Sequence, residues 1–359
     1  MPVPPESRNI NTIRDEARLY EADLPAAQRK QLGQFFSGMR LGKLLAHLAL
    51  DVDTQTVLDP MAGHGDLLDA TCETASERSV SLHRLDGIEI DCSTASKCEE
   101  RLGSMTKTIA SSPEYTVVTG SAFSTKTWSQ LPLGNYDLVI TNPPYVRYQS
   151  SGQNDAKAIR SFLNQQINHL CPESERWVWK ELVAGYSGLA DLSVPSWLLA
   201  AMAVRPGGRL AIIVPATWRS RDYADIIRYM LLRCFALELV VEDTQPGWFS
   251  DALVRTHLIV ARRLDSDGVC VPCGERNKLD NAVWLQIAPS AGDDRSHVGV
   301  AFKGKFPEKA FAAWLAKSAK TSRSGIEVQA FDVSHEYAML ATRARDRQWY
   351  KALEPVSNK

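Results

Sequence analysis

The sequence of 359 residues has no long apolar run, almost no net charge and few cysteines for its length. It contains no stretch of about 18 consecutive apolar residues, so we expect no membrane-spanning helix. Its N-terminus lacks the basic-then-apolar pattern of a secretion signal. The formal net charge is −1, so the overall basic charge of many nucleic-acid-binding proteins is absent, although a local basic face is compatible with it.

The cysteines are evidence against two kinds of structure, a disulfide scaffold and a zinc site. There are seven, an odd number spread through a long chain, which favours reduced thiols in a cytoplasmic protein over a disulfide scaffold. One pair, Cys270-Val-Pro-Cys273, has the spacing of half a zinc site. Zinc needs four ligands and no second pair lies nearby, so we predict no metal.

From residue 55 onward, short apolar runs alternate with helical patterns. This alternation predicts an α/β fold of Rossmann-like type, with a mostly parallel sheet of seven strands and helices on both faces. Ligands of such sheets bind at the carboxyl ends of the strands. Strands are expected at Gln55–Asp59, His83–Ile90, Tyr115–Val118, Tyr136–Thr141, Arg209–Val214, Leu237–Val241 and His257–Val260, with helices at Leu67–Thr74, Ser93–Leu102, Pro195–Val204 and Tyr223–Cys234.

Breaks in the alternation suggest the domain organisation. Residues 1–30 are expected to form a helical N-terminal arm, and residues 31–265 the main domain. A polar insertion at 149–187 interrupts the rhythm after the fourth strand and would overhang the end of that strand. Residues 266–359 are expected to form a short C-terminal region, with turns and short strands at 266–300 and an amphipathic helix at 306–320.

A glycine turn follows the first expected strand, in the run Asp59-Pro-Met-Ala62-Gly63-His-Gly65. Its two glycines allow a sharp turn and close approach of the backbone to a ligand. An acid four residues before the first glycine suits a ligand with a positive ammonium group and would repel a pyrophosphate. Glu89 ends the second strand, where an acid typically binds the ribose hydroxyls of a nucleoside. S-adenosylmethionine combines both groups.

The run Asn142-Pro-Pro-Tyr145 follows the fourth expected strand. The exocyclic amine of a nucleobase is a poor nucleophile, because its lone pair is delocalised into the ring. The side-chain oxygen of Asn142 and the carbonyl of Pro143 would accept its two N–H bonds and stabilise the positive charge that develops during methyl transfer. Pro143 and Pro144 stiffen this loop, and Tyr145 offers a flat face on which an extruded base would stack.

With these motifs in this order, the chain resembles the N6-adenine DNA methyltransferases, from about residue 31 to residue 263. The segment Gln31–Gly38 is similar to the family's cofactor motif before the first strand, and Asn142 is typical of adenine-modifying members. The motif order is that of the group whose DNA-reading domain follows the catalytic domain. The resemblance implies cofactor contacts for Gln34, Phe35, Ser37, Asp59, Ala62, Gly63, Gly65, Glu89, Ile90, Ser121, Ala122, Phe123 and Asn142.

The resemblance further implies transfer of a methyl group from S-adenosylmethionine to N6 of a flipped adenine in double-stranded DNA, in restriction–modification or a related defence. Phe249 matches an aromatic that packs on the other side of the adenine. A separate specificity or restriction subunit is a possible partner, and the short C-terminal region a partial DNA-recognition or partner-docking segment. Candidate contacts to the DNA backbone are Lys157, Arg160, Arg343 and Arg345.

Two departures from the family pattern affect the cofactor site. The family usually has Thr-Pro where this chain has Ser37-Gly38, and an Asp where it has Ser121. An uncharged acceptor should bind the cofactor's adenine amino group more weakly. Two alternatives therefore stay open: the same chemistry on an RNA adenine or a protein glutamine, and a cofactor-impaired DNA-binding subunit of a larger complex.

Overall fold

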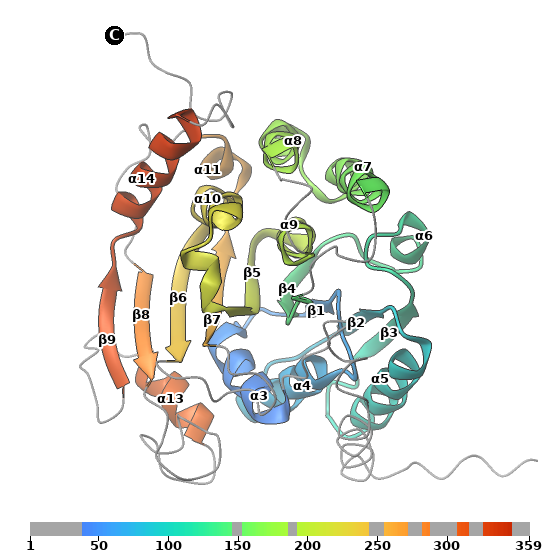
Figure 1. The fold of residues 1–359 in the computed structure, drawn as a ribbon. Coiled ribbons are helices and arrows are strands. Elements are labelled where there is room, and N and C mark those ends of the chain that lie inside the picture. Colours follow the sequence, from blue (N-terminus) through green and yellow to red (C-terminus); the bar gives the residue numbers. More distant parts are fainter. Residues whose placement is uncertain are drawn as a thin grey trace, which may run out of the picture.

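A nine-stranded sheet organises the part of the chain that the computed structural model describes, which comprises residues 38–145, 153–185, 192–243, 255–271, 282–287, 307–315 and 326–346 (Figure 1). The order of its strands is β3-β2-β1-β4-β5-β7-β6-β8-β9. Their bounds are β1 Thr56–Asp59, β2 Arg84–Glu89, β3 Glu114–Thr119, β4 Tyr136–Thr141, β5 Val204–Pro215, β6 Phe235–Asp243, β7 Thr256–Arg263, β8 Ala282–Ile287 and β9 Ile326–Phe331.

Strands β1 to β5 pair in parallel, and β7 lies antiparallel between β5 and β6. All seven expected strands are present, and the mostly parallel α/β sheet is confirmed. The parallel arrangement brings the carboxyl ends of β1, β2, β3 and β4 to one edge of the sheet. The glycine turn and the Asn-Pro-Pro-Tyr loop both leave from that edge.

The expected number of seven strands was wrong, because β8 and β9 extend the sheet beyond β6. Strand β8 pairs in parallel with β6, with Val240 opposite Trp284, and β9 pairs antiparallel with β8. Without β8, the hydrogen-bonding groups along one side of β6 would be left unpaired. The apolar side chains of β8 add to the cores on both faces of the sheet, Ala282 and Trp284 on one face and Leu285 and Ile287 on the other, which stabilises the added strands.

Helices cover both faces of the sheet, as the strand–helix alternation predicts (Figure 1). One apolar core lies between the sheet and one set of helices, and a second core lies on the opposite face. The first set contains α7 Gln153–Leu170, α8 Arg176–Gly185, α9 Ser193–Ala203, α10 Asp225–Cys234 and α14 Val333–Asp346, and the second contains α3 Gly38–Ala49, α4 Asp66–Arg78, α5 Cys92–Met105 and α13 Pro307–Leu315. Within the described residues no helix combines the length and apolar character needed to cross a membrane.

The described parts of the C-terminal region pack directly on the main sheet and its helices. Helix α14 lies on α10, where the rings of Tyr229 and Tyr337 are 5.6 Å apart and Arg233 Nη1 lies 3.1 Å from the Tyr337 hydroxyl. The expected helix at 306–320 is present as α13, which contacts α3. Since Tyr337 is fully buried, α14 is part of the packed core.

A buried ion pair fixes the insertion helices α7 and α8 to the sheet. Arg263, at the end of β7, donates from Nη2 to Oε2 of Glu175 at 2.9 Å, and both side chains are fully buried. Trp179 Nε1 and Ser266 Oγ also donate to this carboxylate, each at 2.9 Å. A buried charge is tolerated only when it is paired and hydrogen-bonded in this way.

We therefore predict that Glu175→Ala lowers the free energy of unfolding by about 3–5 kcal/mol, because it leaves the Arg263 guanidinium buried without its counter-charge. Urea denaturation measures this change. Glu173→Ala, two residues away on an exposed position, is the matched control and should change the free energy by less than about 0.5 kcal/mol. Equal effects of the two substitutions would contradict this interpretation of the pair.

Candidate active site

Two glycines give the turn after β1 its shape. Gly63 and Gly65 have φ angles of 53° and 81°, in the left-handed region that favours glycine. A Cβ atom on Gly65 would also lie 2.8 Å from Cys98 Sγ on α5, closer than packing allows. Gly65 is the N-cap of α4, so the turn places the amino end of that helix beside the carboxyl ends of β1 and β2.

The carboxylate of Glu89 connects this turn to the tip of β2. Its Oε2 accepts the Gly63 N–H at 3.0 Å and its Oε1 accepts the Asp91 N–H at 2.9 Å. Glu89 is only 6% exposed, and burial raises the pKa of its carboxyl group. The two backbone donors hold the carboxylate in place, and each oxygen keeps a second lone pair for a ligand.

Asp59 is the most buried acid of the site, at 1% exposure. It accepts the Met61 N–H at 3.0 Å, but burial, with a smaller contribution from the nearby Glu89 charge, raises its pKa to about 7. A buried acid of this kind ionises readily only when a positive group lies beside it. The site therefore fits a ligand that brings a cation, as the sequence predicts.

The loop after β3 lies at the same carboxyl edge of the sheet as the glycine turn. Ser121 Oγ accepts the Phe123 N–H at 3.1 Å, and the buried Trp128 donates from Nε1 to the Ala122 carbonyl at 2.7 Å. The ring of Phe123 packs edge-on against Phe162 of α7, with centroids 6.1 Å apart. Trp128 and Phe162 were not predicted from the sequence, because they hold the loop through contacts that local motifs do not reveal.

Ile90 is 63% exposed directly after Glu89, at the tip of β2. A large apolar side chain left uncovered beside a buried acid suits the flat apolar face of a nucleobase. Ile90, Glu89 and the loop at 121–123 thus border one edge of the sheet, next to the glycine turn. Among the described residues, no group of three or more His, Cys, Asp or Glu side chains is placed to hold a metal ion.

The Asn-Pro-Pro-Tyr loop leaves β4 immediately beside β1, since Val57 and Leu58 pair with Leu138 and Val139. The structure brings its two key side chains together. The Tyr145 hydroxyl lies 3.0 Å from Asn142 Oδ1 and also contacts the Ile213 carbonyl of β5. The side-chain oxygen of Asn142 is thus in contact with the phenol, and its second lone pair can accept a donor from a ligand.

The candidate contacts to the DNA backbone lie on helices α7 and α14. Lys157 is exposed on α7, and Arg160 is half-buried on the same helix. Arg343 of α14 forms an ion pair with Asp225 of α10 at 3.4 Å, and Arg345 lies on the same helix. The predicted residues Gln34, Phe35, Ser37, Phe249 and Cys273, and the N-terminal arm, lie outside the described residues.

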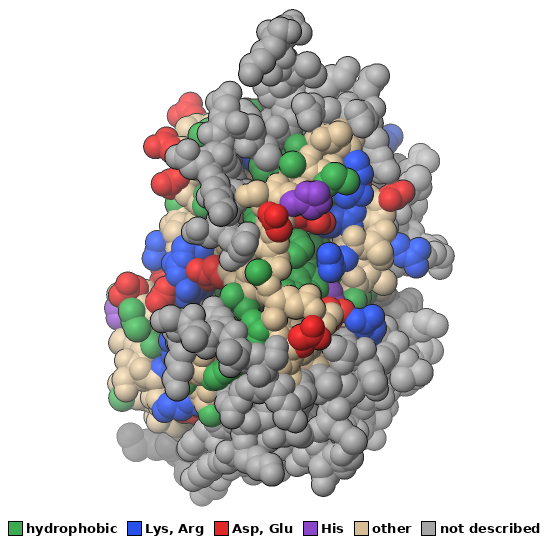
Figure 2. Space-filling model, turned by 90° about the vertical axis from the view of Figure 1, so that its left-hand side faces the viewer, with side chains coloured by type: hydrophobic (Ala, Val, Ile, Leu, Met, Phe, Trp, Pro, Cys, Tyr) green, Lys and Arg blue, Asp and Glu red, His purple; other side chains and the backbone are tan. Residues whose placement is uncertain are grey.

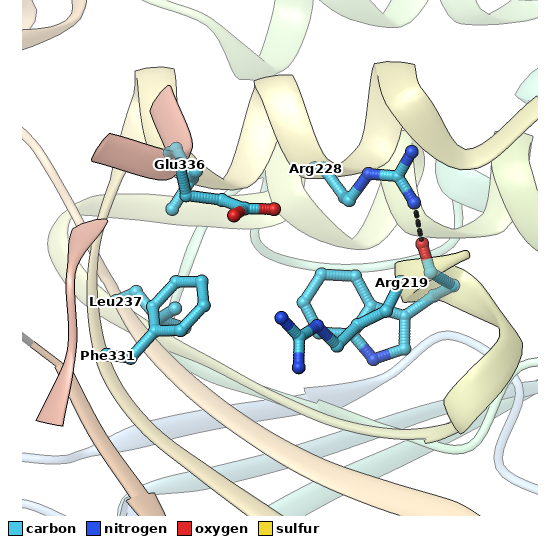
Figure 3. Close-up of a pocket in the computed structure, with 7 residues that line it drawn as sticks. Arg219, Arg228, Leu237, Phe331 and Glu336 are labelled. Atoms are coloured by element: carbon cyan, nitrogen blue, oxygen red, sulfur yellow. Dashed lines mark hydrogen bonds between the residues drawn. The ribbon is translucent and has the colours of Figure 1, made fainter. Parts of the chain in front are cut away.

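A separate pocket lies between η2 Ala216–Arg219, α10, β9 and α14 (Figure 3). Arg228 donates from Nη1 to the Trp218 carbonyl at 2.7 Å, and the Arg219 guanidinium lies 4.5 Å above the ring of Trp284. None of the predicted site residues lines it, so we do not assign it to the active site. The neighbouring face beside β9 and α14 mixes acidic, basic and apolar side chains, with no field of one sign over its described part (Figure 2).

A parallel sheet with this glycine turn, a buried acid at the tip of β2 and the Asn-Pro-Pro-Tyr loop after β4 defines a nucleoside-binding group-transfer domain. The model of the N-6 DNA Methylase family matches residues 18–266, more than half of the sequence. The chain therefore belongs to the N-6 DNA methylase family, whose members use S-adenosylmethionine.

Individual relatives agree with this family. The chain is 22% identical over 246 residues to the Type II methyltransferase M.AccI of Acinetobacter calcoaceticus, covering 68% of this chain and 39% of the relative. Its fold is similar to that of the methyltransferase subunit of a type I restriction-modification system from Streptococcus thermophilus, with a TM-score of 0.56, 16% identity, and coverage of 88% of this chain and 58% of that chain. The type IIG restriction endonuclease BpuSI gives a TM-score of 0.59 at 17% identity, with 96% of this chain and 36% of that chain covered.

Because Asp59 is buried, its ionised carboxylate should lower the stability of the ligand-free protein. Unfolded, this carboxyl ionises above about pH 4, whereas the folded state keeps its proton up to about pH 7. The penalty for ionisation therefore grows between these two values and stays constant above pH 7. At pH 8, Asp59→Asn should raise the free energy of unfolding by on the order of 2–4 kcal/mol, since the amide avoids that penalty.

Urea denaturation of both proteins at pH 8 and at pH 4.5 tests this prediction. Near pH 4.5 the folded wild type is protonated at Asp59, so most of the difference should vanish. An Asp59→Asn variant that is less stable than the wild type at pH 8 would show that the carboxylate is a structural acceptor and not a group held for a cationic ligand.

Proposed function

We propose that this chain transfers a methyl group from S-adenosylmethionine to the exocyclic N6 of an adenine in double-stranded DNA, in restriction–modification or a related defence. The observation that carries the proposal is the placement of Asn142 and Tyr145 at the end of β4, next to the glycine turn after β1. The family supports this reaction, and the relatives described above include a Type II methyltransferase and the methyltransferase subunit of a type I restriction-modification system.

Asp59 and Glu89 would hold the two ends of the cofactor. The buried, proton-holding Asp59 would face the ammonium of the methionine end, and Glu89 would accept hydrogen bonds from the ribose hydroxyls. Ile90 would cover one face of the cofactor's adenine, with Ser121 and Phe123 at its rim. The full proposed set is Gln34, Phe35, Ser37, Asp59, Ala62, Gly63, Gly65, Glu89, Ile90, Ser121, Ala122, Phe123 and Asn142.

The bound cofactor would supply a methyl group activated by a positive sulfonium. Asn142 Oδ1 and the Pro143 carbonyl would accept the two N–H bonds of the target amine, which directs its lone pair outward and stabilises the developing positive charge. Tyr145 would give up its contact with Asn142 and stack on the extruded base, with Phe249 on the other face. None of these steps uses a metal ion.

DNA contacts and partners belong to the same proposal. Lys157, exposed on α7, and Arg160 on the same helix would touch the phosphate backbone. Arg343 is paired with Asp225, so it would contact a phosphate only by exchanging that partner. The chain spans 39% of the curated relative and 58% and 36% of the two solved structures. A separate specificity subunit is a proposed partner, because one of the similar structures is a subunit of a type I restriction-modification system.

The direct test of the reaction is methyl transfer from labelled S-adenosylmethionine to unmethylated plasmid DNA, followed by digestion to nucleosides. We expect N6-methyladenine as the labelled product. Asn142→Ala should lower the rate by at least about 10²-fold, since it removes an acceptor used in the transition state. Gln55→Ala removes an exposed side-chain amide at the amino end of β1, on the opposite edge of the sheet, and is the control that should leave the rate unchanged.

Label in RNA or protein instead of DNA would contradict the proposed substrate. If the wild type labels nothing alone, the assay is repeated with a cell extract of the source organism. Labelled DNA in that case would identify a required partner, and no label in any fraction would contradict the proposed activity.

The uncharged Ser121 predicts weakened cofactor binding that one substitution should restore. In Ser121→Asp, one carboxylate oxygen would keep the Phe123 N–H bond and the other would accept the adenine amino group with a full charge. We expect the Kd for S-adenosylhomocysteine, measured by calorimetry, to fall by about 3–10-fold. Ser124→Asp adds the same charge three residues away and should leave the Kd unchanged; equal Kd values for wild type and Ser121→Asp would contradict the assignment.

A further inference from the structure

We infer that Asp66 is a positioning residue that clamps the start of α3 to the glycine turn, and so joins the two segments proposed to hold the methionine end of the cofactor. This inference rests on the proposed function for its consequence, but its structural basis is independent of it. Asp66 is the first residue of α4 and follows Gly65 directly.

The first contact reaches α3. Asp66 Oδ2 accepts the backbone N–H of Gly38 at 3.1 Å, across 28 residues of sequence. Gly38 begins α3 and directly follows Ser37, the last residue of the proposed N-terminal cofactor segment. Whatever fixes the Gly38 amide therefore also fixes the point where that segment enters the fold.

The second contact reaches α5 and the glycine turn. Asp66 Oδ1 accepts from Arg101 Nη1 at 2.5 Å, and Arg101 is only 2% exposed. The same Nη1 lies 3.3 Å from the carbonyl oxygen of His64, between the two glycines of the turn. One guanidinium thus holds both the backbone of the turn and the carboxylate that holds α3.

Asp69 is the natural comparison for Asp66. It lies one turn further along α4 and accepts from Arg101 Nε at 2.6 Å, so both acids neutralise the same guanidinium. The single N–H of Gly38, however, points to Asp66. The two acids therefore share a role in the ion pair and differ in the link to α3.

The backbone of Gly38 suits this clamp and would not suit a proline. Its φ angle is +68°, whereas the proline ring fixes φ near about −65° and removes the N–H donor. Because position 38 is a glycine, its N–H is available to donate to Asp66.

The test compares Asp66→Asn with Asp69→Asn. An amide has one acceptor oxygen, so Asn at position 66 cannot serve both Gly38 and Arg101, whereas the Asp69→Asn variant keeps the Gly38 bond. We expect the Kd for S-adenosylhomocysteine, measured by calorimetry, to rise at least about tenfold in Asp66→Asn and by less than about threefold in Asp69→Asn. In turnover assays Asp66→Asn should raise the KM for S-adenosylmethionine while kcat stays near the wild-type value.

Amide hydrogen exchange of the ligand-free proteins gives a readout that needs no cofactor. The peptide at the start of α3 should exchange faster in Asp66→Asn than in Asp69→Asn or wild type. Gly38→Pro, which removes the donor and leaves Arg101 untouched, should reproduce the loss of cofactor affinity. Circular dichroism and thermal unfolding establish that each variant is folded before these comparisons.

Equal loss of affinity in the two Asn variants, with equal exchange at α3, would overturn the inference and reduce Asp66 to one half of an ion pair. Tighter cofactor binding by Gly38→Pro would overturn it as well. If the wild type itself fails to bind S-adenosylhomocysteine, the proposed cofactor site fails, and the exchange comparison still decides whether the clamp exists.

Discussion

The hydrogen bonds from the Gly63 and Asp91 amides to the Glu89 carboxylate are the interaction on which this site depends. They tie the turn after β1 to the tip of β2 and bring a second acid, Asp59, within range of the Glu89 charge. Two buried carboxylates at one edge oppose folding unless one keeps its proton. This energetic cost falls at a position where a cationic ligand would remove it. Such destabilising groups are common at binding sites.

Local motifs identify functional residues that lie close together in the sequence. Asp59, the glycines and Asn142 lie in such runs, and the structure places each at the carboxyl edge of the sheet. Arg101 and Trp128 were not predicted, because they act on the site from another helix through contacts with backbone carbonyls. Nothing in the spacing of their neighbours distinguishes them from ordinary helix residues.

The strands likewise fall into two groups: those that a local sequence pattern predicts, and those that depend on pairing with a distant part of the chain. The seven expected strands have strong local patterns between helices, and all of them form. Strand β8 pairs with β6, more than 40 residues earlier, and β9 exposes half of its residues, so neither has a pattern that stands out from its surroundings. Arg101, Arg233 and Arg263 are buried in internal networks, so the sequence alone does not show which basic residues are accessible to DNA.

We propose that the proton held by Asp59 is released when the positive charge of the cofactor binds beside it. Calorimetric titration with S-adenosylmethionine in buffers of different ionisation enthalpy, between pH 6 and pH 8.5, measures the protons exchanged on binding. Because the Asp59 pKa is about 7 without ligand and the cofactor's amino group is already an ammonium at pH 6, we expect release of close to one proton per cofactor bound at pH 6. Toward pH 8.5 this release should disappear, because Asp59 is then ionised before binding and the cofactor's amine, with a pKa of about 8, takes up a proton to bind as the ammonium. Binding that exchanges no proton at pH 6, or that takes one up, would contradict it.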